Sequence, residues 1–491
     1  MMSKIGGTVR LDKKYLSTDL LDKIRKDCTI RYTVMGESSE QVLKTYSESP
    51  TEISIPRDYG RFCIGIPEAT ENLTTDKRGQ FSPDFYRKEP ITPRDALQAD
   101  FFSSVANVCK RDGVIDCMAN ARTGSGKTVA SLALIRDLGA PALVVVHTNR
   151  LKEQWIGVPG EKSGMRFFFG DNFADNCVGI VQQDECDFEG KAVVVASLAS
   201  LVSRKYPDEL YKYFGLVIFD EVHKMGAPEM SKVMSLFNAR VRLGLTATNR
   251  RDALKAVCDL HLGKPKIVSG QSVLRPKIFN VVYTSKMNSY FMRFSKVARN
   301  MVITKLAEDP IRNDLLTKII YERGYQRNRN IVVLSDRISQ LQHIQRELIK
   351  RGVPENTIGL YVDKYKQRVF KDGKWVMKDI KVKEEEFKRI TKECSIILAT
   401  YGIFATGTDI PRIDFGVEAT PRANQDQAIG RILRLYDGKP QPEWIGVEDK
   451  ILLFDRNLWY KDIELVKYGR FNSYRRQQAT QILNVDASSL M

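Results

Sequence analysis

Residues suited to holding a nucleotide phosphate follow an apolar stretch of the chain. The segment ARTGSGKT begins at Ala121, directly after an apolar run, and leads into a stretch with helical periodicity. Gly124 and Gly126 allow the backbone to wrap around phosphates with its N–H groups inward, and a helix N-terminus adds partial positive charge. Lys127 can reach the β- and γ-phosphates, and the Thr128 hydroxyl can bind Mg²⁺. The pattern predicts a phosphate-binding loop, in which Ala121 replaces the first glycine of the general motif.

Two adjacent carboxylates, Asp220 and Glu221, end another apolar run. Asp220 could hold Mg²⁺ through water, and Glu221 could orient or deprotonate the water that attacks a phosphate. An acidic pair that merely opens a surface loop is the alternative. Because the pair follows the phosphate-binding loop inside the same expected sheet, the pattern favours a nucleotide site.

A third cluster, in QAIGRILR, contains Gln427, Arg431 and Arg434. Arginines three residues apart share one face of a helix. Two guanidinium groups there could neutralise a γ-phosphate from a second domain, a contribution of about 10³–10⁵ in rate. A basic helix exposed to solvent is the alternative, and the other two clusters argue against it.

The elements that must position these residues are short apolar runs that alternate with helical patterns. Unbroken β-branched runs are typical of strands buried on both faces, and therefore of parallel α/β sheets. The runs are 114–119, 142–147, 192–197, 216–221 and 242–247, followed by 277–283, 330–335, 395–400, 414–419 and 451–455. We therefore expect two α/β domains in tandem.

The chain is expected to divide into four parts. Residues 1–88 predict a small α+β accessory domain that could bind DNA, 89–270 and 271–455 predict the two α/β domains, and 456–491 predict a basic, aromatic, helical extension. The stretch 66–92, rich in Pro, Thr, Asp and Lys, is interpreted as a linker. The aromatic residues of the extension could pack on the second α/β domain or face nucleic acid.

Composition narrows the classes of function. The chain has 491 residues, with 77 Lys and Arg against 60 Asp and Glu, a net charge of +17 and a pI near 9.3. This excess favours a polyanionic partner, most simply nucleic acid, over a basic surface kept for solubility. No apolar run is long enough to span a bilayer, and no secretory signal is visible. The eight scattered cysteines are expected to be reduced thiols of a cytoplasmic protein.

The order of the motifs resembles that of a known enzyme family. ARTGSGKT, DEVH, LTAT and QAIGRILR resemble motifs I, II, III and VI of superfamily 2 helicases. Other stretches resemble the adenine-reading glutamine (Gln98), motif Ia (from His147), motif IV (from Val332) and motif V (from Ala399). The segments L-x-x-QW, SDR-x-x-x-L and ATPRANQDQAIGRILR are similar to the branch that holds XPB, the type III restriction motors and the phage UvsW-type branch-migration helicases. Asn249 departs from the proline usual in that branch.

The resemblance implies two RecA-like domains with MgATP in the cleft between them. Gln98 would read the adenine, Thr246 and Thr248 would link hydrolysis to domain movement, and His223 would contact Gln427. The residues expected to bind the nucleotide or Mg²⁺, or to act in catalysis, are Gln98, Arg122, Thr123, Gly124, Ser125, Gly126, Lys127, Thr128, Asp220, Glu221, Gly407, Asp409, Gln427, Arg431 and Arg434.

Contacts with nucleic acid are implied as well. They would grip the sugar–phosphate backbone from the carboxyl ends of strands, which makes binding sequence-tolerant and salt-dependent. The residues expected there are Thr148, Asn149, Arg150, Ser197, Arg337 and Thr400. For each basic residue, a solvated surface charge is the alternative.

An insertion at about 364–383 predicts a hairpin on the second α/β domain. Asp372-Gly373 is a strong signal for a two-residue turn between alternating segments. Phe370 and Trp375 lie close to that turn. One hypothesis is that the hairpin separates the strands of a duplex, because aromatic side chains stack on bases. A surface hairpin without such a role is the alternative.

These features together predict an ATP-dependent DNA helicase or translocase that remodels branched DNA (forks, D-loops and Holliday junctions) by branch migration, with 3′–5′ movement. Its cofactors would be ATP and Mg²⁺, and its partner would be DNA. It would work as a monomer in the cytoplasm, away from membranes. A restriction or transcription-termination motor is the first alternative, and an RNA helicase is the second. A binding scaffold without turnover is disfavoured because Lys127, Glu221, Arg431 and Arg434 are all present.

Overall fold

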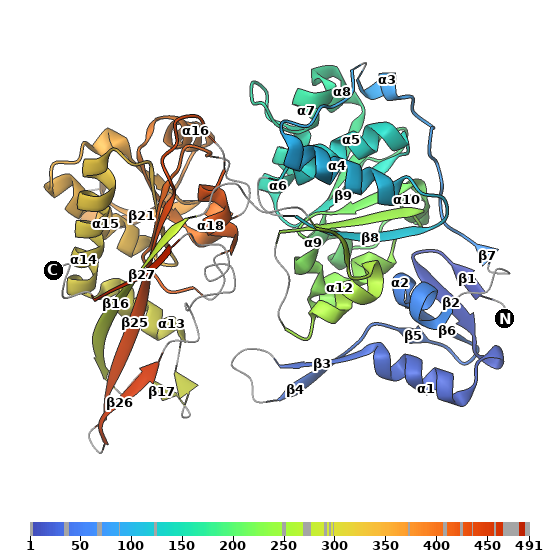
Figure 1. Cartoon of the computed structure of the whole chain (residues 1–491), viewed down its shortest axis with the longest axis horizontal. Coiled ribbons are helices and arrows are strands. Elements are labelled where there is room, and N and C mark those ends of the chain that lie inside the picture. Colours follow the sequence, from blue (N-terminus) through green and yellow to red (C-terminus); the bar gives the residue numbers. More distant parts are fainter. Residues whose placement is uncertain are drawn as a thin grey trace. The chain divides into compact units, whose positions relative to one another are not determined.

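The structure is a computed structural model in which the chain forms two compact units, Met1–Gln271 and Ser272–Met491 (Figure 1). The residues it describes are 3–33, 39–65, 71–87, 89–121, 125–247, 252–268, 276–288, 292–293, 296–297, 299–371, 374–405, 410–422, 426–434, 436–455, 458–464 and 481–486.

The first unit begins with a small α+β segment. Its sheet has the strand order β5-β6-β2-β1-β7, and β3 and β4 form a separate antiparallel pair. Helix α1 starts where the Ser17 hydroxyl accepts a hydrogen bond from the N–H of Leu20 (3.2 Å). The bounds are β1 Ser3–Ile5, β2 Thr8–Asp12, α1 Thr18–Asp27, β3 Thr29–Thr33, β4 Glu40–Lys44, β5 Ser47–Glu48, β6 Glu52–Pro56, α2 Arg57–Tyr59 and β7 Glu71–Asn72.

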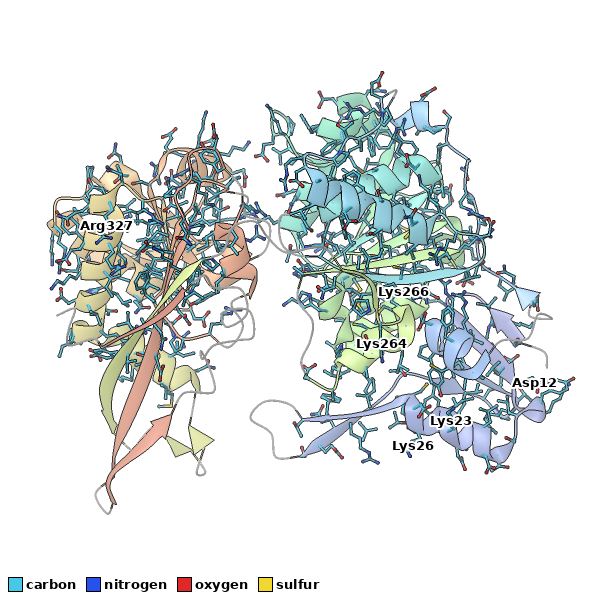
Figure 2. The ribbon with its side chains drawn as sticks, in the orientation of Figure 1. Asp12, Lys23, Lys26, Lys264, Lys266 and Arg327 are labelled. Carbon is cyan, nitrogen blue, oxygen red and sulfur yellow. The ribbon has the colours of Figure 1, made fainter. Side chains whose placement is uncertain are left out.

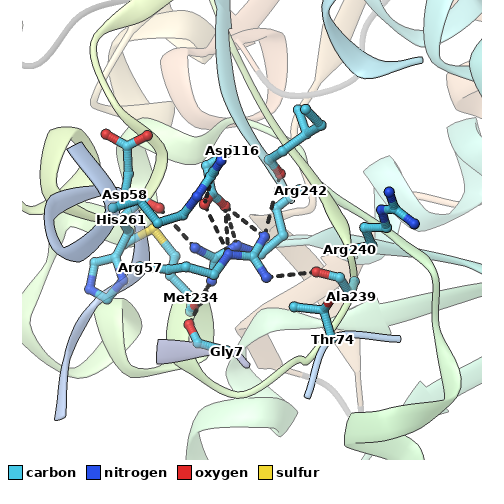
Figure 3. A network of polar contacts seen from close by, with 12 residues as sticks. Gly7, Arg57, Asp58, Thr74, Asp116, Met234, Ala239, Arg240, Arg242 and His261 are labelled. Atoms are coloured by element: carbon cyan, nitrogen blue, oxygen red, sulfur yellow. Dashed lines mark hydrogen bonds and ion pairs between the residues drawn. The ribbon is translucent and has the colours of Figure 1, made fainter. Parts of the chain in front are cut away.

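A buried polar network joins this segment to the sheet that follows it. Arg57 Nη2 lies 2.7 Å from Oδ1 of Asp116, and Arg242 Nε lies 2.6 Å from the same oxygen (Figure 3). All three side chains are fully buried. Arg57 also donates to the carbonyl of Ala239, and Arg242 donates to the carbonyl of Gly7. The N-terminal segment is therefore held by charged contacts that water does not reach.

The prediction that residues 66–92 form a linker is wrong for the residues that the structure describes. Strand β7 pairs with β1, and Tyr86 of α3 (Pro83–Tyr86) is buried against Phe169 and Phe173, with ring centroids 5.4 and 5.3 Å away. Aromatic residues within a polar stretch decide this packing, because burying one ring outweighs the polar composition around it. A domain boundary at residue 88 stays a prediction.

The main sheet of the first unit is parallel except for its edge strand β11, with the order β11-β10-β12-β9-β13-β14-β8-β15. Five of its strands lie where the apolar runs predict them. The bounds are α4 Ala96–Cys109, β8 Ile115–Asn120, α5 Lys127–Leu138, β9 Ala142–Val146, α6 Asn149–Ile156, α7 Gly164–Phe169, α8 Asp171–Asn176, β10 Val178–Gln182, β11 Glu185–Cys186, β12 Val193–Ser197, α9 Leu198–Ser203, α10 Asp208–Tyr213, β13 Leu216–Phe219, α11 Pro228–Ser231, β14 Val241–Thr246, α12 Lys255–Leu262 and β15 Pro265–Val268.

Helices cover both faces of this sheet. Alternate strand residues such as Val144 pack with α4, α5 and α6 in one hydrophobic cluster. The residues between them, such as Val145, pack with α9, α10 and α12 in another cluster. Figure 1 shows α4 and α5 on one side of the strands and α9 and α12 on the other. This doubly covered parallel sheet explains why its strands are apolar throughout.

The second unit repeats this architecture with the strand order β20-β23-β19-β24-β25-β16-β27, all parallel. Both units are therefore RecA-like α/β domains. The bounds are β16 Lys277–Asn288, β17 Met292–Arg293, β18 Lys296–Val297, α13 Arg299–Glu308, α14 Pro310–Ile319, β19 Ile331–Ser335, α15 Ile338–Lys350, β20 Ile358–Tyr361, β21 Lys364–Lys371, β22 Lys374–Lys381, α16 Glu384–Glu393, β23 Ile396–Thr400, α17 Tyr401–Ala405, β24 Phe415–Glu418, α18 Asp426–Ile432, β25 Glu443–Asp455, β26 Leu458–Glu464 and β27 Gln481–Asp486.

The prediction that residues 456–491 are helical is wrong for the described residues 458–464 and 481–486. Strand β26 pairs antiparallel with β25, and β27 pairs parallel with β16 at the edge of the sheet. Both strands use backbone groups that the sheet would otherwise leave unpaired, and this requirement overrides local helical preference. Residues 465–480 lie outside the described part of the chain.

The predicted insertion forms a hairpin. Strands β21 and β22 are antiparallel, with Lys364 opposite Lys381 and Lys371 opposite Lys374. Phe370 and Trp375 are opposite each other in this register.

Within the described residues, no helix has the length and apolar character needed to cross a membrane.

Candidate nucleotide and nucleic-acid site

The predicted site residues of the first unit gather at the carboxyl edge of its main sheet. Lys127 follows β8, Asp220 follows β13, and Thr246 ends β14, and these three strands are neighbours in the sheet. Ser197 ends β12, which pairs with β9, and Thr148 follows β9. Carboxyl ends of parallel strands are where α/β sheets bind ligands. The sheet therefore brings the predicted nucleotide residues together and sets the predicted nucleic-acid residues beside them.

The phosphate-binding loop leads directly into α5. Gly126 caps this helix with a left-handed φ of +87°, and a Cβ there would lie 1.9 Å from Nε2 of Gln98. Glycine is therefore required both by the backbone and by the amide packed against it. The Gln98 Oε1 accepts a hydrogen bond from the N–H of Arg94 (2.7 Å), which fixes the amide beside the loop. Lys127 Nζ donates to the carbonyl of Ala121 (2.8 Å) and so lies across the loop.

The charge of Lys127 acts on both paired carboxylates, whose pKa values shift in opposite directions. Burial and the neighbouring charge of Glu221 raise the pKa of Asp220 to about 6. Burial also acts on Glu221, but a hydrogen bond from His223 and the charge of Lys127 hold its pKa down to about 2. Two adjacent buried carboxylates beside a lysine suit a divalent cation, which would keep both of them ionised.

Asp220 is held in place by two donors. The backbone N–H of Glu221 donates to its Oδ1 (2.9 Å), and the indole Nε1 of Trp155 donates to its Oδ2 (2.9 Å). Trp155 is only 1% exposed and belongs to α6, the helix that contains most of the predicted motif Ia. Sequence reasoning missed this role, although the QW pair was visible within motif Ia. A tryptophan whose N–H is buried needs an acceptor, and this need was the available signal.

Glu221 also connects to the end of β14. Its backbone has a left-handed φ of +50°, a conformation that costs a non-glycine residue roughly 1–3 kcal/mol. His223 Nδ1 lies 3.2 Å from Glu221 Oε2 and 3.1 Å from Oγ1 of Thr246. The predicted catalytic carboxylate and the predicted coupling threonine are thus joined through one imidazole.

The described residues fit a magnesium nucleotide. Ser125 Oγ and His147 Nδ1 are buried without a hydrogen-bond partner among the described residues, which suits a polar ligand at this edge. Thr128 is the second residue of α5, directly after the lysine, where its hydroxyl could reach a cation. Lys127 and Thr128 with Asp220 and Glu221 are the groups that would hold phosphate and Mg²⁺.

Helix α6 presents the predicted nucleic-acid contacts of motif Ia. Thr148 caps it by accepting from the N–H of Leu151 (3.3 Å), which places Asn149 and Arg150 in its first turn. Gln182 donates to Oδ1 of Asn149 (2.9 Å). The polar groups of this turn therefore lie at an open edge of the sheet, and their contact with nucleic acid stays a prediction.

In the second unit, Arg337 and Thr400 lie at the carboxyl ends of the neighbouring strands β19 and β23. Arg337 Nε donates to Oγ1 of Thr304 and Nη2 donates to the carbonyl of Asn300, both at 3.0 Å, so its guanidinium is engaged within the unit. Thr400 ends β23. Arg431 lies in the last turn of α18 and Arg434 follows that helix; both are half-buried.

Several predicted residues cannot be compared with the structure. The structure does not describe Arg122, Thr123, Gly124, Thr248, Gly407 and Asp409. For Gln427, Phe370 and Trp375 it describes the backbone and not the side chain.

Similarity to known proteins agrees with this geometry. Residues 94–251 match the family described as type III restriction enzyme, res subunit. A protein of Acanthamoeba polyphaga mimivirus, described as an ATP-dependent RNA helicase, is 24% identical over 452 residues, covering 89% of this chain and 80% of the viral protein. A helicase of Escherichia phage T5 is 24% identical over 339 residues, 66% of each chain. The crystal structure of T4 UvsW aligns with 99% of this chain and 100% of its own, at 16% identity and a TM-score of 0.36.

The matched family region contains Gln98, Lys127, Asp220 and Glu221, which the first unit brings to one sheet edge. The mimivirus and phage relatives are both described as helicases. The matched region and the viral relatives therefore support a superfamily 2 helicase related to the type III restriction motor subunits.

Proposed function

We propose that the protein is an ATP-dependent DNA helicase or translocase that remodels branched DNA, including forks, D-loops and Holliday junctions, with 3′–5′ movement, in recombination, repair or replication. The observation that carries the nucleotide part is that Lys127, Asp220 and Glu221 lie at the carboxyl edge of one parallel sheet, after the neighbouring strands β8 and β13. The net charge of +17 supports a polyanionic partner. The viral relatives support action in the cytoplasm of a host cell.

The chemistry follows from the groups at the sheet edge. MgATP, when bound, supplies the phosphoanhydride bond whose hydrolysis drives movement. Lys127 would neutralise the phosphates, and Thr128 with Asp220 would hold the cation. Glu221 would orient the attacking water and accept its proton. We retain Arg431 and Arg434 as the residues that neutralise charge on the γ-phosphate.

The link from hydrolysis to movement would begin at His223. Its imidazole touches both Glu221 and Thr246, so a change at the water-activating carboxylate reaches the end of β14 directly. Thr148, Asn149 and the rest of the motif Ia turn would grip a strand backbone nearby. A grip that differs before and after hydrolysis becomes a step along the strand.

The first test is hydrolysis with and without nucleic acid. ATPase activity is expected to rise strongly with DNA and to vanish in Lys127→Ala, while Glu221→Gln should still bind ATP without turning it over. Nucleotide binding by both variants, followed with a fluorescent ATP analogue, separates loss of chemistry from loss of binding. An unchanged rate in Lys127→Ala would refute the assigned site.

RNA is the second candidate substrate, because the mimivirus relative is described as an RNA helicase. Matched DNA and RNA versions of a fork, a four-way junction and a tailed duplex should be compared for ATPase stimulation and unwinding. Preference for the branched DNA forms is expected. Stimulation by RNA alone would move the assignment to an RNA helicase.

A further inference from the structure

One surface of the first unit combines an exposed aromatic ring with lysines from distant parts of the chain. Phe62, in the helical turn Gly60–Gly65, is 62% exposed. Lys23 and Lys26 of α1 are exposed, as are Lys264 and Lys266 near the start of β15. Figure 2 labels these four lysines, with Lys23 and Lys26 by α1 at the lower end of the unit and Lys264 and Lys266 above them. We call the six residues Lys23, Lys26, Arg61, Phe62, Lys264 and Lys266 the Phe62 surface.

Two cations lie against the Phe62 ring. The Arg61 guanidinium lies 4.8 Å and Lys266 Nζ 4.9 Å from the ring centroid. Lys266 Nζ also donates to the carbonyl of Asp116 (2.9 Å), and Arg61 lies 3.5 Å from the Asp116 carboxylate. Both cations are therefore anchored to the buried network below, so they fix the ring while most of it stays open to solvent.

The three other lysines are available to a ligand. Elsewhere in the N-terminal segment, Lys13 and Arg25 both bind Glu48, at 3.0 and 3.1 Å, so their charge is already neutralised. Among the described residues, Lys23, Lys26 and Lys264 form no ion pair.

Charged side chains from α1 and from the residues around β15 lie near the Cys63 thiol. Burial raises the pKa of the Cys63 thiol, next to Phe62, and the charges of Lys23 and Lys264 both oppose that rise. Lys23 of α1 and Lys264, directly before β15, therefore both lie near this thiol.

Two carboxylates, Asp58 and Asp27, also act on the Cys63 thiol, and both are bound within the unit. Asp27 accepts a hydrogen bond from the Tyr59 hydroxyl (2.8 Å), and Asp58 is only 8% exposed. Asp58 lies 3.7 Å from Lys266, beneath the surface. Exposed cations around an open ring match a chain of phosphates that carries stackable bases.

We propose that the Phe62 surface binds the phosphate backbone of a nucleic-acid strand and stacks one of its bases on Phe62. The proposal rests on the proposed function, because the strand is the substrate of the same motor. It adds a second grip, on the same rigid unit as the nucleotide site but outside the helicase motifs. Lysine contacts with phosphates give salt-dependent affinity, and ring stacking gives affinity that salt changes little.

The test measures affinity for a fluorescein-labelled tailed DNA duplex by anisotropy at several salt concentrations. Phe62→Ala should weaken binding at least fivefold with an unchanged salt slope. Lys23→Glu with Lys264→Glu should weaken binding at least tenfold and reduce the slope of log K against log[salt] by about 1.5, as expected for two lost phosphate contacts.

The matched control is Lys212→Glu with Lys232→Glu, which changes the net charge equally at two other exposed lysines of the first unit. Binding within twofold of the unsubstituted protein is expected for this control. Equal losses in the control and in the Lys23/Lys264 variant, or unchanged binding by Phe62→Ala, would overturn the proposal. If the unsubstituted protein itself binds neither DNA nor RNA, the proposed function fails instead.

Discussion

Arg57, directly after the last long strand of the N-terminal segment, places its guanidinium on the carboxylate of Asp116, the second residue of β8, with Nη2 2.7 Å from Oδ1. Arg242 binds the same carboxylate (Figure 3). Burial alone would raise the pKa of Asp116, but these two positive charges hold it well below its usual range. The strand that leads into the phosphate-binding loop is therefore fastened to the N-terminal segment by its own buried charge.

Replacement of Arg57 should show how much this network contributes. Arg57→Met removes a buried guanidinium that also binds the carbonyls of Gly6 and Ala239, and we expect a loss of about 3 kcal/mol in the free energy of unfolding. Urea unfolding measures this. Arg31→Met, which breaks the exposed ion pair with Glu40, is the control and should cost less than about 1 kcal/mol. Equal small losses would mean that the network does not hold the segment.

The indole of Trp155 should position Asp220 for its cation. Trp155→Phe keeps a buried ring but removes the N–H that binds Oδ2, and loss of such a supporting hydrogen bond typically weakens metal sites by 10-fold or more. We expect the Mg²⁺ concentration for half-maximal ATPase to rise about tenfold, with thermal stability nearly unchanged. Trp444→Phe, at an equally buried tryptophan of the second unit, is the control. Identical Mg²⁺ titrations for both variants would remove Trp155 from this role.

Asp58 should make stability depend on pH. Burial, followed by the charge of Asp116, raises its pKa to about 6, while Lys266, Arg61 and Arg242 partly oppose the rise. The folded chain therefore binds a proton more tightly than the unfolded chain, and stability falls as pH rises from about 4 to 6. Asp58→Asn lacks this penalty. Its free energy of unfolding, minus that of the unsubstituted protein, should therefore rise by about 2 kcal/mol from pH 4 to pH 8.

Urea unfolding of both proteins at the two pH values measures this gain. If the variant instead loses stability relative to the unsubstituted protein as the pH rises from 4 to 8, the ionised Asp58 carboxylate is favourable in the folded state.

The hairpin β21–β22 is proposed to separate duplex strands. Phe370→Ser with Trp375→Ser removes the aromatic pair beside the turn, and loss of stacking on a base should slow unwinding at least fivefold. DNA-stimulated ATPase should stay within twofold, because the substitutions leave the nucleotide residues intact. Val369→Ser with Val376→Ser, the neighbouring register pair, is the control. Normal unwinding by the aromatic variant, or after deletion of 368–378, would leave the hairpin without this function.

Much of the fold was predictable because it depends on local pattern. The apolar runs mark ten strands of the two sheets, since a strand buried on both faces has to be apolar along its whole length. The pairing of β21 with β22 was predictable because Asp372-Gly373 is a turn signal between two alternating segments. Asp220 and Glu221 were recognisable for a similar reason, since they stand directly after such a strand, and Lys127 was recognisable from the glycine loop that follows another.

The tertiary structure decided which distant polar groups share a buried place. Asp116 and Arg242 stand inside apolar runs, which signals buried charges, but the partner Arg57 is 59 residues from Asp116, and Arg242 is 126 residues away. Trp155 and Asp220 are 65 residues apart, and the strands at 458–464 and 481–486 join a sheet edge that local preference does not reveal. A buried charge or N–H must be paired, but its own sequence does not say with which group, because only the packed chain determines what lies beside it.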